Sequence, residues 1–162
     1  MRQLYIIMGP AGCGKSSITE TLSEATGWPM IEADDHHSGA NVAKQAAGQP
    51  LTDADRAAWI GSIVNTVNGG DATNTLLACS ALTPYVQERL RDELQPECHW
   101  FLLEVSEVEL ARRLSARKDH FMPASLLQDQ LKALSAPSQA HRVNGEQSIE
   151  QICADILSLI KS

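Results

Sequence analysis

The chain has 162 residues, of which 43% are hydrophobic and 20% are charged, so it has the length of a single domain and a composition that excludes a disordered or fibrous protein. Its 13 Lys and Arg residues against 20 Asp and Glu residues give a net charge of −7, which argues against a nucleic-acid partner. The apolar runs are shorter than a membrane span, and Leu4–Met8 is too short for a secretory signal, so we expect a cytoplasmic protein with no membrane partner.

Strand and helix patterns alternate along the first half of the chain. β-branched and aromatic residues predict a strand over Gln3–Met8, and after a glycine-rich turn the polar-to-apolar pattern predicts a helix over Ser16–Ala25. A second short strand is expected over Met30–Ala33, followed by a helix around Ala40–Ala47. Thr52 is a suitable cap for the next helix, the longest in the chain, which is expected to end at a pair of glycines.

The second half of the chain repeats this alternation. In chain order we expect a strand over Asn74–Ser80, a helix from Pro84 to about Leu94, a strand over His99–Val105, helices over Glu107–Ala116 and Pro123–Leu134, a weak strand near Val143 and a helix over Ser148–Ile160. Strands that alternate with helices predict an α/β fold of three layers, in which helices flank a parallel sheet.

The turn after the first predicted strand fits the phosphate-binding P-loop pattern, in which two glycines five residues apart are followed by Lys and Ser. In such a loop consecutive backbone N–H groups point at phosphate oxygens, and the following helix adds its positive N-terminus. Lys15 is expected at the β- and γ-phosphates of ATP, and the Ser16 hydroxyl is expected to bind Mg²⁺. We therefore assign ATP binding to Gly9, Pro10, Ala11, Gly12, Cys13, Gly14, Lys15, Ser16 and Ser17.

Two carboxylates, Glu32 and Asp34, lie at the end of the second predicted strand, where the carboxyl edge of a parallel sheet forms a crevice. Because alternate residues of a strand share a face, both can point into this crevice. We assign Asp34 as the base that orients an acceptor hydroxyl, and Glu32, one step deeper, to Mg²⁺ through a bound water. The alternative for Asp34 is a turn or helix-cap residue, and the nearby P-loop favours the catalytic role.

Four cations crowd the end of the predicted helix Glu107–Ala116: Arg112, Arg113, Arg117 and Lys118. One interpretation is a solvated basic face. In an acidic protein with a P-loop we favour a cationic lid over the phosphates, around residues 113–134. We assign Arg113 and Arg117 to ATP and Arg117 also to catalysis, while which of the four cations touches phosphate stays open.

Ordered sequence blocks identify a family. GPAGCGKSS, EADDHH, GQPLTDADRAAW, CSAL and ARKDHFM, in this order and spacing, resemble the small P-loop gluconate kinases. The resemblance runs from about residue 3 to residue 134, with a looser match beyond. It implies a fold similar to shikimate and adenylate kinases, phosphorylation of D-gluconate to 6-phosphogluconate with ATP and Mg²⁺, and a homodimer.

Family motif positions also suggest the substrate pocket. The resemblance assigns gluconate binding to Asp34, His37, Asn41, Lys44 and Arg56, residue types that suit a polyol carboxylate. The chain departs from the family pattern by having Glu32 where an Asp is usual. In the same block as Arg56, Trp59 is interpreted as a core residue.

Two other functions remain open from the sequence alone. A kinase of another small metabolite, such as shikimate kinase, is expected to carry substrate arginines near the end of the third strand, where this chain has Cys79-Ser80-Ala81-Leu82. A module that binds ATP without turnover is the alternative from another class, and intact Lys15, Ser16 and Asp34 argue against it.

Overall fold

The fold is built on a parallel sheet of five strands in the order β2-β3-β1-β4-β5. It is seen in a computed structural model that describes residues 1–116 and 124–162. The strands are β1 (Gln3–Met8), β2 (Met30–Glu32), β3 (Asn74–Ala78), β4 (Glu97–Glu104) and β5 (His141–Asn144). All five were predicted; the bounds of β1 agree with the prediction, and those of the others differ by one or a few residues.

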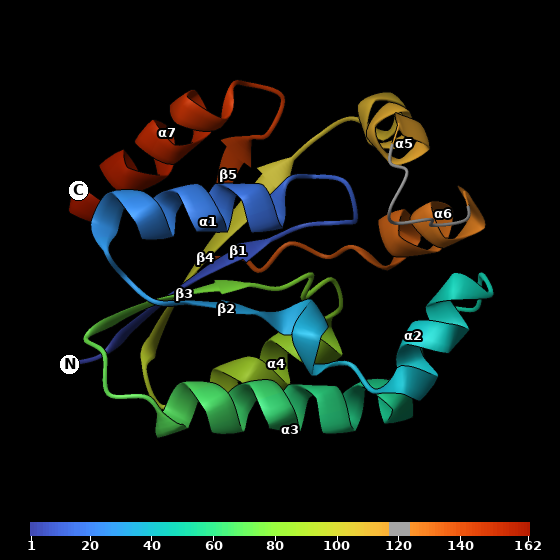
Figure 1. The fold of residues 1–162 in the computed structure, drawn as a ribbon, viewed down its shortest axis with the longest axis horizontal. Coiled ribbons are helices and arrows are strands. Elements are labelled where there is room, and N and C mark those ends of the chain that lie inside the picture. The colour runs from blue at the N-terminus through green and yellow to red at the C-terminus, as the bar shows by residue number, and fades with distance from the viewer. Residues whose placement is uncertain (117–123) are drawn as a thin grey trace.

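Helices cover both faces of this sheet. Figure 1 shows α1 and α7 on one face and α3 and α4 on the other, as expected for three layers. The helices of the described residues are α1 (Lys15–Thr26), α2 (Gly39–Ala46), α3 (Asp53–Gly69), α4 (Pro84–Glu93), α5 (Glu107–Ala116), α6 (Ala124–Ala133) and α7 (Ile149–Lys161), with a 3₁₀ turn η1 (Ala33–His36) after β2. The predicted α/β fold with a parallel sheet is confirmed.

The central strand β1 is buried on both faces because its side chains alternate between two cores. Leu4, Ile6 and Met8 pack with the side chains of α3 and α4, whereas Tyr5 and Ile7 pack with those of α1 and α7. The near-continuous apolar sequence of β1 is typical of a parallel strand covered by helices on both sides. The carboxyl ends of β1, β2 and β3 therefore meet at one edge of the sheet.

Three of the strands, β2, β3 and β4, end earlier than the sequence pattern predicts, and two of these ends have a visible cause. β2 ends at Glu32, because the Glu32 carboxylate accepts a hydrogen bond from the Asp34 backbone N–H at 3.5 Å and so caps the turn η1. β3 ends at Ala78, and the chain then turns through Ala81, which has a left-handed φ of 46°. Both early ends turn the chain at the edge where the P-loop also lies.

The predicted cap of the longest helix is present. The Thr52 hydroxyl accepts from the Asp55 N–H at 3.2 Å, and the Asp55 carboxylate accepts from the Thr52 N–H at 2.9 Å, which together make a capping box. Such a cap contributes about 1 kcal/mol. It fixes the start of α3, the helix that flanks the turn η1.

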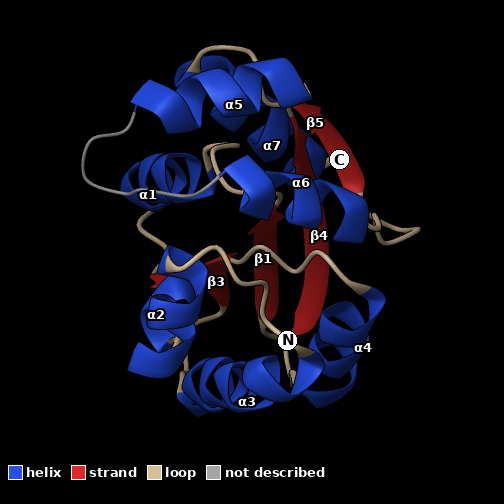
Figure 2. Cartoon of the chain, turned by 90° about the vertical axis from the view of Figure 1, so that its right-hand side faces the viewer, coloured by secondary structure: helices blue, strands red, loops and turns tan. Residues whose placement is uncertain are grey.

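Three further helices lie at the carboxyl edge of the sheet. Figures 1 and 2 show α2, α5 and α6 around this edge. The segment after α6 is joined to the loop after β3, because the Ser135 N–H donates to the Leu82 carbonyl at 2.8 Å. Within the described ranges, every helix is too short or too polar to cross a membrane.

Candidate active site

The P-loop has the backbone conformation that its glycines allow. Gly9, Gly12 and Gly14 have φ angles of 151°, 87° and 101°, values that other residues rarely adopt. A Cβ atom at Gly9 would lie 2.6 Å from the Cys13 Sγ, so this position has no room for a side chain. Gly14 is the N-cap of α1, so the P-loop leads directly into the N-terminus of that helix.

Lys15 and Ser16 occupy the first turn of α1. The Lys15 Nζ donates to the Pro10 carbonyl at 3.2 Å, so the ammonium lies across the P-loop. The Ser16 hydroxyl donates to the Glu32 carboxylate, which comes from the end of β2. The cation Lys15 and the two groups assigned to Mg²⁺ are thus brought together from two segments, the start of α1 and the end of β2.

Glu32 is a half-buried carboxylate. Burial is the largest cause that raises its pKa, and the charge of Asp34 also raises it, whereas the hydrogen bond from Ser16 acts in the opposite direction. A carboxylate beside a hydroxyl is an all-oxygen donor pair, which suits Mg²⁺ and its bound waters. The two residues therefore fit the assignment made from the sequence.

Asp34 lies on the exposed side of η1. In the described parts of the chain, no side chain or backbone group hydrogen-bonds its carboxylate, so the carboxylate oxygens can accept a proton or a hydrogen bond from a ligand. Asp34 raises the pKa of His37, but the larger effect of burial lowers it, which favours the neutral imidazole.

Helix α3 holds the turn that carries Asp34. The Trp59 indole N–H donates to the Ala33 carbonyl at 2.7 Å, and its ring stacks on His37 with 4.5 Å between ring centroids and 6° between planes. The His36 Nδ1 lies 2.7 Å from the Ser62 hydroxyl. The core interpretation of Trp59 is confirmed by its 3% exposure. The hydrogen bond from its indole N–H to the Ala33 carbonyl was not predicted from the sequence. A buried indole N–H needs an acceptor, which is the signal that could have indicated it.

A cavity of about 260 Å³ opens beside this turn. Its described lining comprises His37, Gln45, Pro50, Leu51, Arg56, Trp59, Ser80, Leu82, Thr83, Val86, Leu126, Asp129, Gln130 and Ala133. Arg56 is the one Lys or Arg side chain in this set, and among the described residues its guanidinium forms one ion pair, with the exposed Asp53 carboxylate at 3.4 Å. The cavity therefore offers one cation and several hydrogen-bonding groups to a small polar ligand.

Asn41 and Lys44 were predicted near the same pocket, but neither lines the cavity. Asn41 is 6% exposed and its amide donates to the Asp55 carbonyl at 2.9 Å. The Lys44 ammonium pairs with the Asp55 carboxylate at 2.5 Å, and this hydrogen bond is the main reason that the pKa of Asp55 falls to about 2. These contacts support a role in holding α2 against the start of α3, while their contact with substrate stays a prediction.

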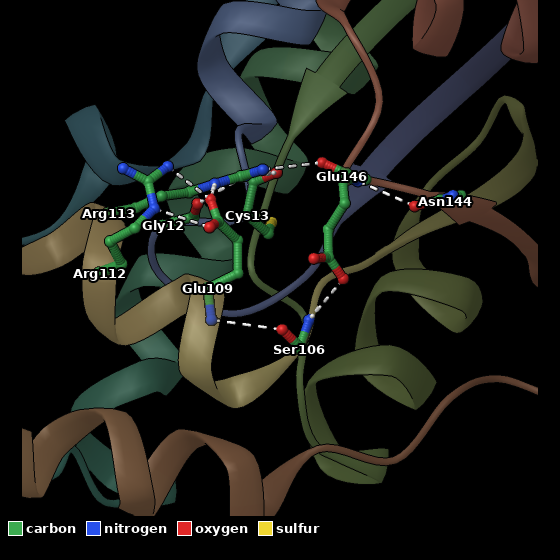
Figure 3. A network of polar contacts seen from close by, with 9 residues as sticks. Gly12, Cys13, Ser106, Glu109, Arg112, Arg113, Asn144 and Glu146 are labelled. Atoms are coloured by element: carbon green, nitrogen blue, oxygen red, sulfur yellow. Dashed lines mark hydrogen bonds and ion pairs between the residues drawn. The ribbon is translucent and has the colours of Figure 1, made fainter.

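Arg113, on α5, is hydrogen-bonded to the P-loop (Figure 3). Its guanidinium donates to the carbonyls of Gly12 at 3.2 Å, Cys13 at 3.4 Å and Gly145 at 3.0 Å, and to the Glu109 carboxylate at 2.8 Å. These are carbonyl and carboxylate acceptors, so the contacts stabilise the loop itself. Contact of Arg113 with phosphate stays a prediction, and Arg117 and Lys118 lie outside the described residues.

Comparison with known proteins decides the family. A gluconokinase from Gluconobacter oxydans is 38% identical over 162 residues, which cover 96% of this chain and 89% of the relative. The chain belongs to the gluconokinase family. A crystal structure of a gluconokinase from Sinorhizobium meliloti superposes with a TM-score of 0.85 at 35% identity. The match covers 98% of this chain and 92% of that gluconokinase chain. No family model matches the chain.

A more distant structure shows how far the gluconokinase fold is shared. Shikimate kinase from Aquifex aeolicus has a TM-score of 0.62 at 13% identity, with 98% of this chain and 96% of that chain covered. This likeness extends to the fold alone. The family membership therefore favours the gluconate kinase interpretation of the sequence over the shikimate kinase alternative.

Glu32→Gln offers a test of the assigned metal site in this gluconokinase-family protein. The substitution keeps an oxygen for the Ser16 hydroxyl but removes the charge, so we expect kinase activity to need a higher Mg²⁺ concentration. Glu32→Asp restores the usual residue of the family and is expected to be tolerated. Titration of activity against Mg²⁺ measures both effects, and an unchanged Mg²⁺ requirement in Glu32→Gln would contradict the assignment.

The same substitution is expected to stabilise the protein. Because the pKa of Glu32 is raised in the folded state, its carboxyl favours folding below the ordinary Glu pKa of about 4.3, and this contribution is lost as the pH rises through the folded pKa. At neutral pH the variant lacks the half-buried charge, so its Tm should exceed that of the wild type, and the difference should shrink toward pH 4. Glu20→Gln, on the exposed side of α1, removes the same charge as a control.

Proposed function

We propose that this protein transfers the γ-phosphoryl group of ATP to the 6-hydroxyl of D-gluconate, giving ADP and 6-phosphogluconate. The observation that carries the proposal is the cavity itself, which His37 and Arg56 line beside the turn η1 in a chain of the gluconokinase family. Arg56 suits the carboxylate of a six-carbon acceptor, and Asp34, on η1 but outside the described lining, is assigned to the hydroxyl at the other end.

The P-loop residues assigned above hold the donor in this proposal. Backbone N–H groups of the loop and the Lys15 ammonium bind the β- and γ-phosphates. Ser16 and Glu32 would hold Mg²⁺, Ser16 directly and Glu32 through a water, and the ion would supply positive charge to neutralise the phosphates. Arg113 stabilises the conformation of the loop by donating hydrogen bonds to the Gly12 and Cys13 carbonyls.

Asp34 performs the acid–base step. Its carboxylate accepts the proton of the 6-hydroxyl while that oxygen forms a bond to the γ-phosphorus. The bond from the γ-phosphorus to the oxygen bridging it to the β-phosphate breaks, and the electron pair leaves with ADP. The proton is then released from Asp34 to solvent, which the exposed position of this residue allows.

Arg56 recognises the other end of the acceptor. A guanidinium binds a carboxylate through two parallel hydrogen bonds, and the weak 3.4 Å contact with Asp53 leaves its other donors available. The neutral ring of His37 and the hydroxyls of Ser80 and Thr83 are suited to the hydroxyl groups between the two ends.

We expect Arg56→Gln to raise the KM for gluconate by about 10- to 100-fold and to leave the KM for ATP unchanged, since a hydrogen bond to a charged group contributes about 1.5–3 kcal/mol. Steady-state kinetics with each substrate varied in turn measure this. Lys44→Gln removes the same charge from an ammonium that Asp55 holds, so its effect should be smaller. Equal effects of the two variants would contradict a specific contact by Arg56.

The finer expectations from the sequence are part of the same proposal. Mg²⁺ dependence and a homodimer rest on the resemblance of the sequence blocks to gluconate kinases. A cytoplasmic location rests on the short apolar runs of the sequence, and a phosphate contact from Arg117 rests on the cluster of cations at the end of the predicted helix Glu107–Ala116. Sedimentation equilibrium of the purified protein tests the homodimer, for which the expected mass is twice 17.6 kDa.

An acceptor panel tests the proposed function. ADP formation is measured with ATP and Mg²⁺ in the presence of gluconate, shikimate, a nucleoside monophosphate or no acceptor. Gluconate is expected to give the highest kcat/KM. Turnover of shikimate with none of gluconate would favour the other small-metabolite kinase, and ATP binding with no turnover on any acceptor would favour a sensing module.

A further inference from the structure

Gln130 on α6 lies between the P-loop and the cavity. Its side-chain Oε1 accepts a hydrogen bond from the Ala11 backbone N–H at 2.8 Å, and the same side chain lines the cavity. In the part of the chain that the structure describes, no other cavity-lining residue hydrogen-bonds the segment Gly9–Ser16. One side chain therefore connects the donor site with the acceptor site.

Helix α6 is held firmly enough to position this side chain. Leu126 and Leu127, on its first turn, are each 3% exposed. Beyond its last turn, the Ser135 N–H donates to the Leu82 carbonyl at 2.8 Å, and the buried Gln87 amide donates to the Ser135 carbonyl at 2.5 Å. Gln130 is thus supported at both ends of its helix.

The orientation of the Gln130 amide follows from its partner. A backbone N–H can only donate, so the atom opposite Ala11 must be the carbonyl oxygen of the side chain. The Nε2 group, with two protons to donate, is then the remaining polar group of this amide. No hydrogen bond joins it to any described residue, and the cavity that Gln130 lines is the place where a partner can approach.

We propose that Gln130 is an acceptor-binding residue, whose Nε2 donates to one hydroxyl oxygen of gluconate while its Oε1 stays on the P-loop. This inference rests on the proposed function. Because the same planar amide contacts both sites, it fixes the separation between the acceptor and the phosphates of ATP. It also discriminates against aldonates that lack the hydroxyl in question, since the Nε2 donor would then be left unpaired.

The test compares Gln130→Ala with Gln128→Ala, a matched truncation at an exposed position of the same helix. Gln130→Glu is a third variant, which keeps an oxygen for the Ala11 N–H but has no donor. We expect Gln130→Ala and Gln130→Glu to lower kcat/KM for gluconate by about 10-fold or more and to change the KM for ATP by less than about 2-fold. Gln128→Ala should resemble the wild type in both constants.

A series of aldonates, each lacking one hydroxyl, separates binding from support of the fold. With the analogue that lacks the bound hydroxyl, wild type and Gln130→Ala should have the same kcat/KM, whereas the other analogues should keep the 10-fold difference. An equal loss with every analogue, or no loss with gluconate, would overturn the proposal for Gln130. If the wild type phosphorylates a different acceptor, the proposed function fails, and the same comparison on that acceptor then decides the role of Gln130. No turnover on any acceptor would overturn both.

Discussion

Asp34→Asn is expected to lower kcat by about 10²-fold or more while the affinity for ATP barely changes. The substitution keeps the size and one acceptor oxygen but removes the charge and the ability to take the proton from the acceptor hydroxyl. Asp34 is exposed on η1 and its carboxylate hydrogen-bonds no described group, so the loss of its charge should disturb neither the turn nor the P-loop. Single-turnover kinetics and nucleotide titration measure the two quantities separately.

The adjacent residue provides the control for this variant. Asp35 is also exposed on η1, and Asp35→Asn removes the same charge one position away. We expect it to keep near-normal turnover. If Asp34→Asn retained turnover while Glu32→Gln abolished it at every Mg²⁺ concentration, the roles of the two carboxylates would have to be exchanged.

Lys15→Ala is expected to reduce turnover by about 10²- to 10³-fold with little change in Tm. The ammonium binds the phosphates more strongly as negative charge shifts during transfer, so its loss acts mainly on the transition state. In the protein alone its contact is a hydrogen bond to the Pro10 carbonyl at 3.2 Å on a partly exposed side chain, which contributes little to folding.

Activity and thermal unfolding must be measured on the same preparation of this variant. Lys132→Ala removes an exposed positive charge from α6 and is expected to change neither. Normal activity of Lys15→Ala would place the ammonium away from the phosphates. A large drop in Tm together with lost activity would instead indicate that the side chain supports the loop.

Local patterns in the sequence were sufficient for the elements and for the P-loop. A glycine turn between a strand and a helix needs only neighbouring residues, and the capping box of Thr52 and Asp55 spans four positions. The pairing of Ser16 with Glu32 was also within reach, because the first two strands end at the same edge of a parallel sheet. These features depend on spacing and on a known topology.

Side-chain contacts between residues far apart in the sequence could not be predicted from such local patterns. Gln130 meets Ala11 across 119 positions of sequence, and nothing in its helical pattern distinguishes it from Gln128. Likewise, the ion pair that occupies the Lys44 ammonium depends on how α2 lies against the start of α3. Spacing predicts which face of a helix is apolar, but the angle between two helices decides which polar side chains reach one another.

The product formed from ATP and gluconate is the most direct test of the account. Purified protein is incubated with ATP, Mg²⁺ and D-gluconate, and the product is identified by mass spectrometry and by phosphorus NMR. We predict ADP and a gluconate phosphate, in equal amounts, with the phosphate on the 6-oxygen, and about 10²-fold less of this product or lower still from the Asp34→Asn variant over the same time. Release of inorganic phosphate without a phosphorylated gluconate, or phosphorylation at another position, would contradict it.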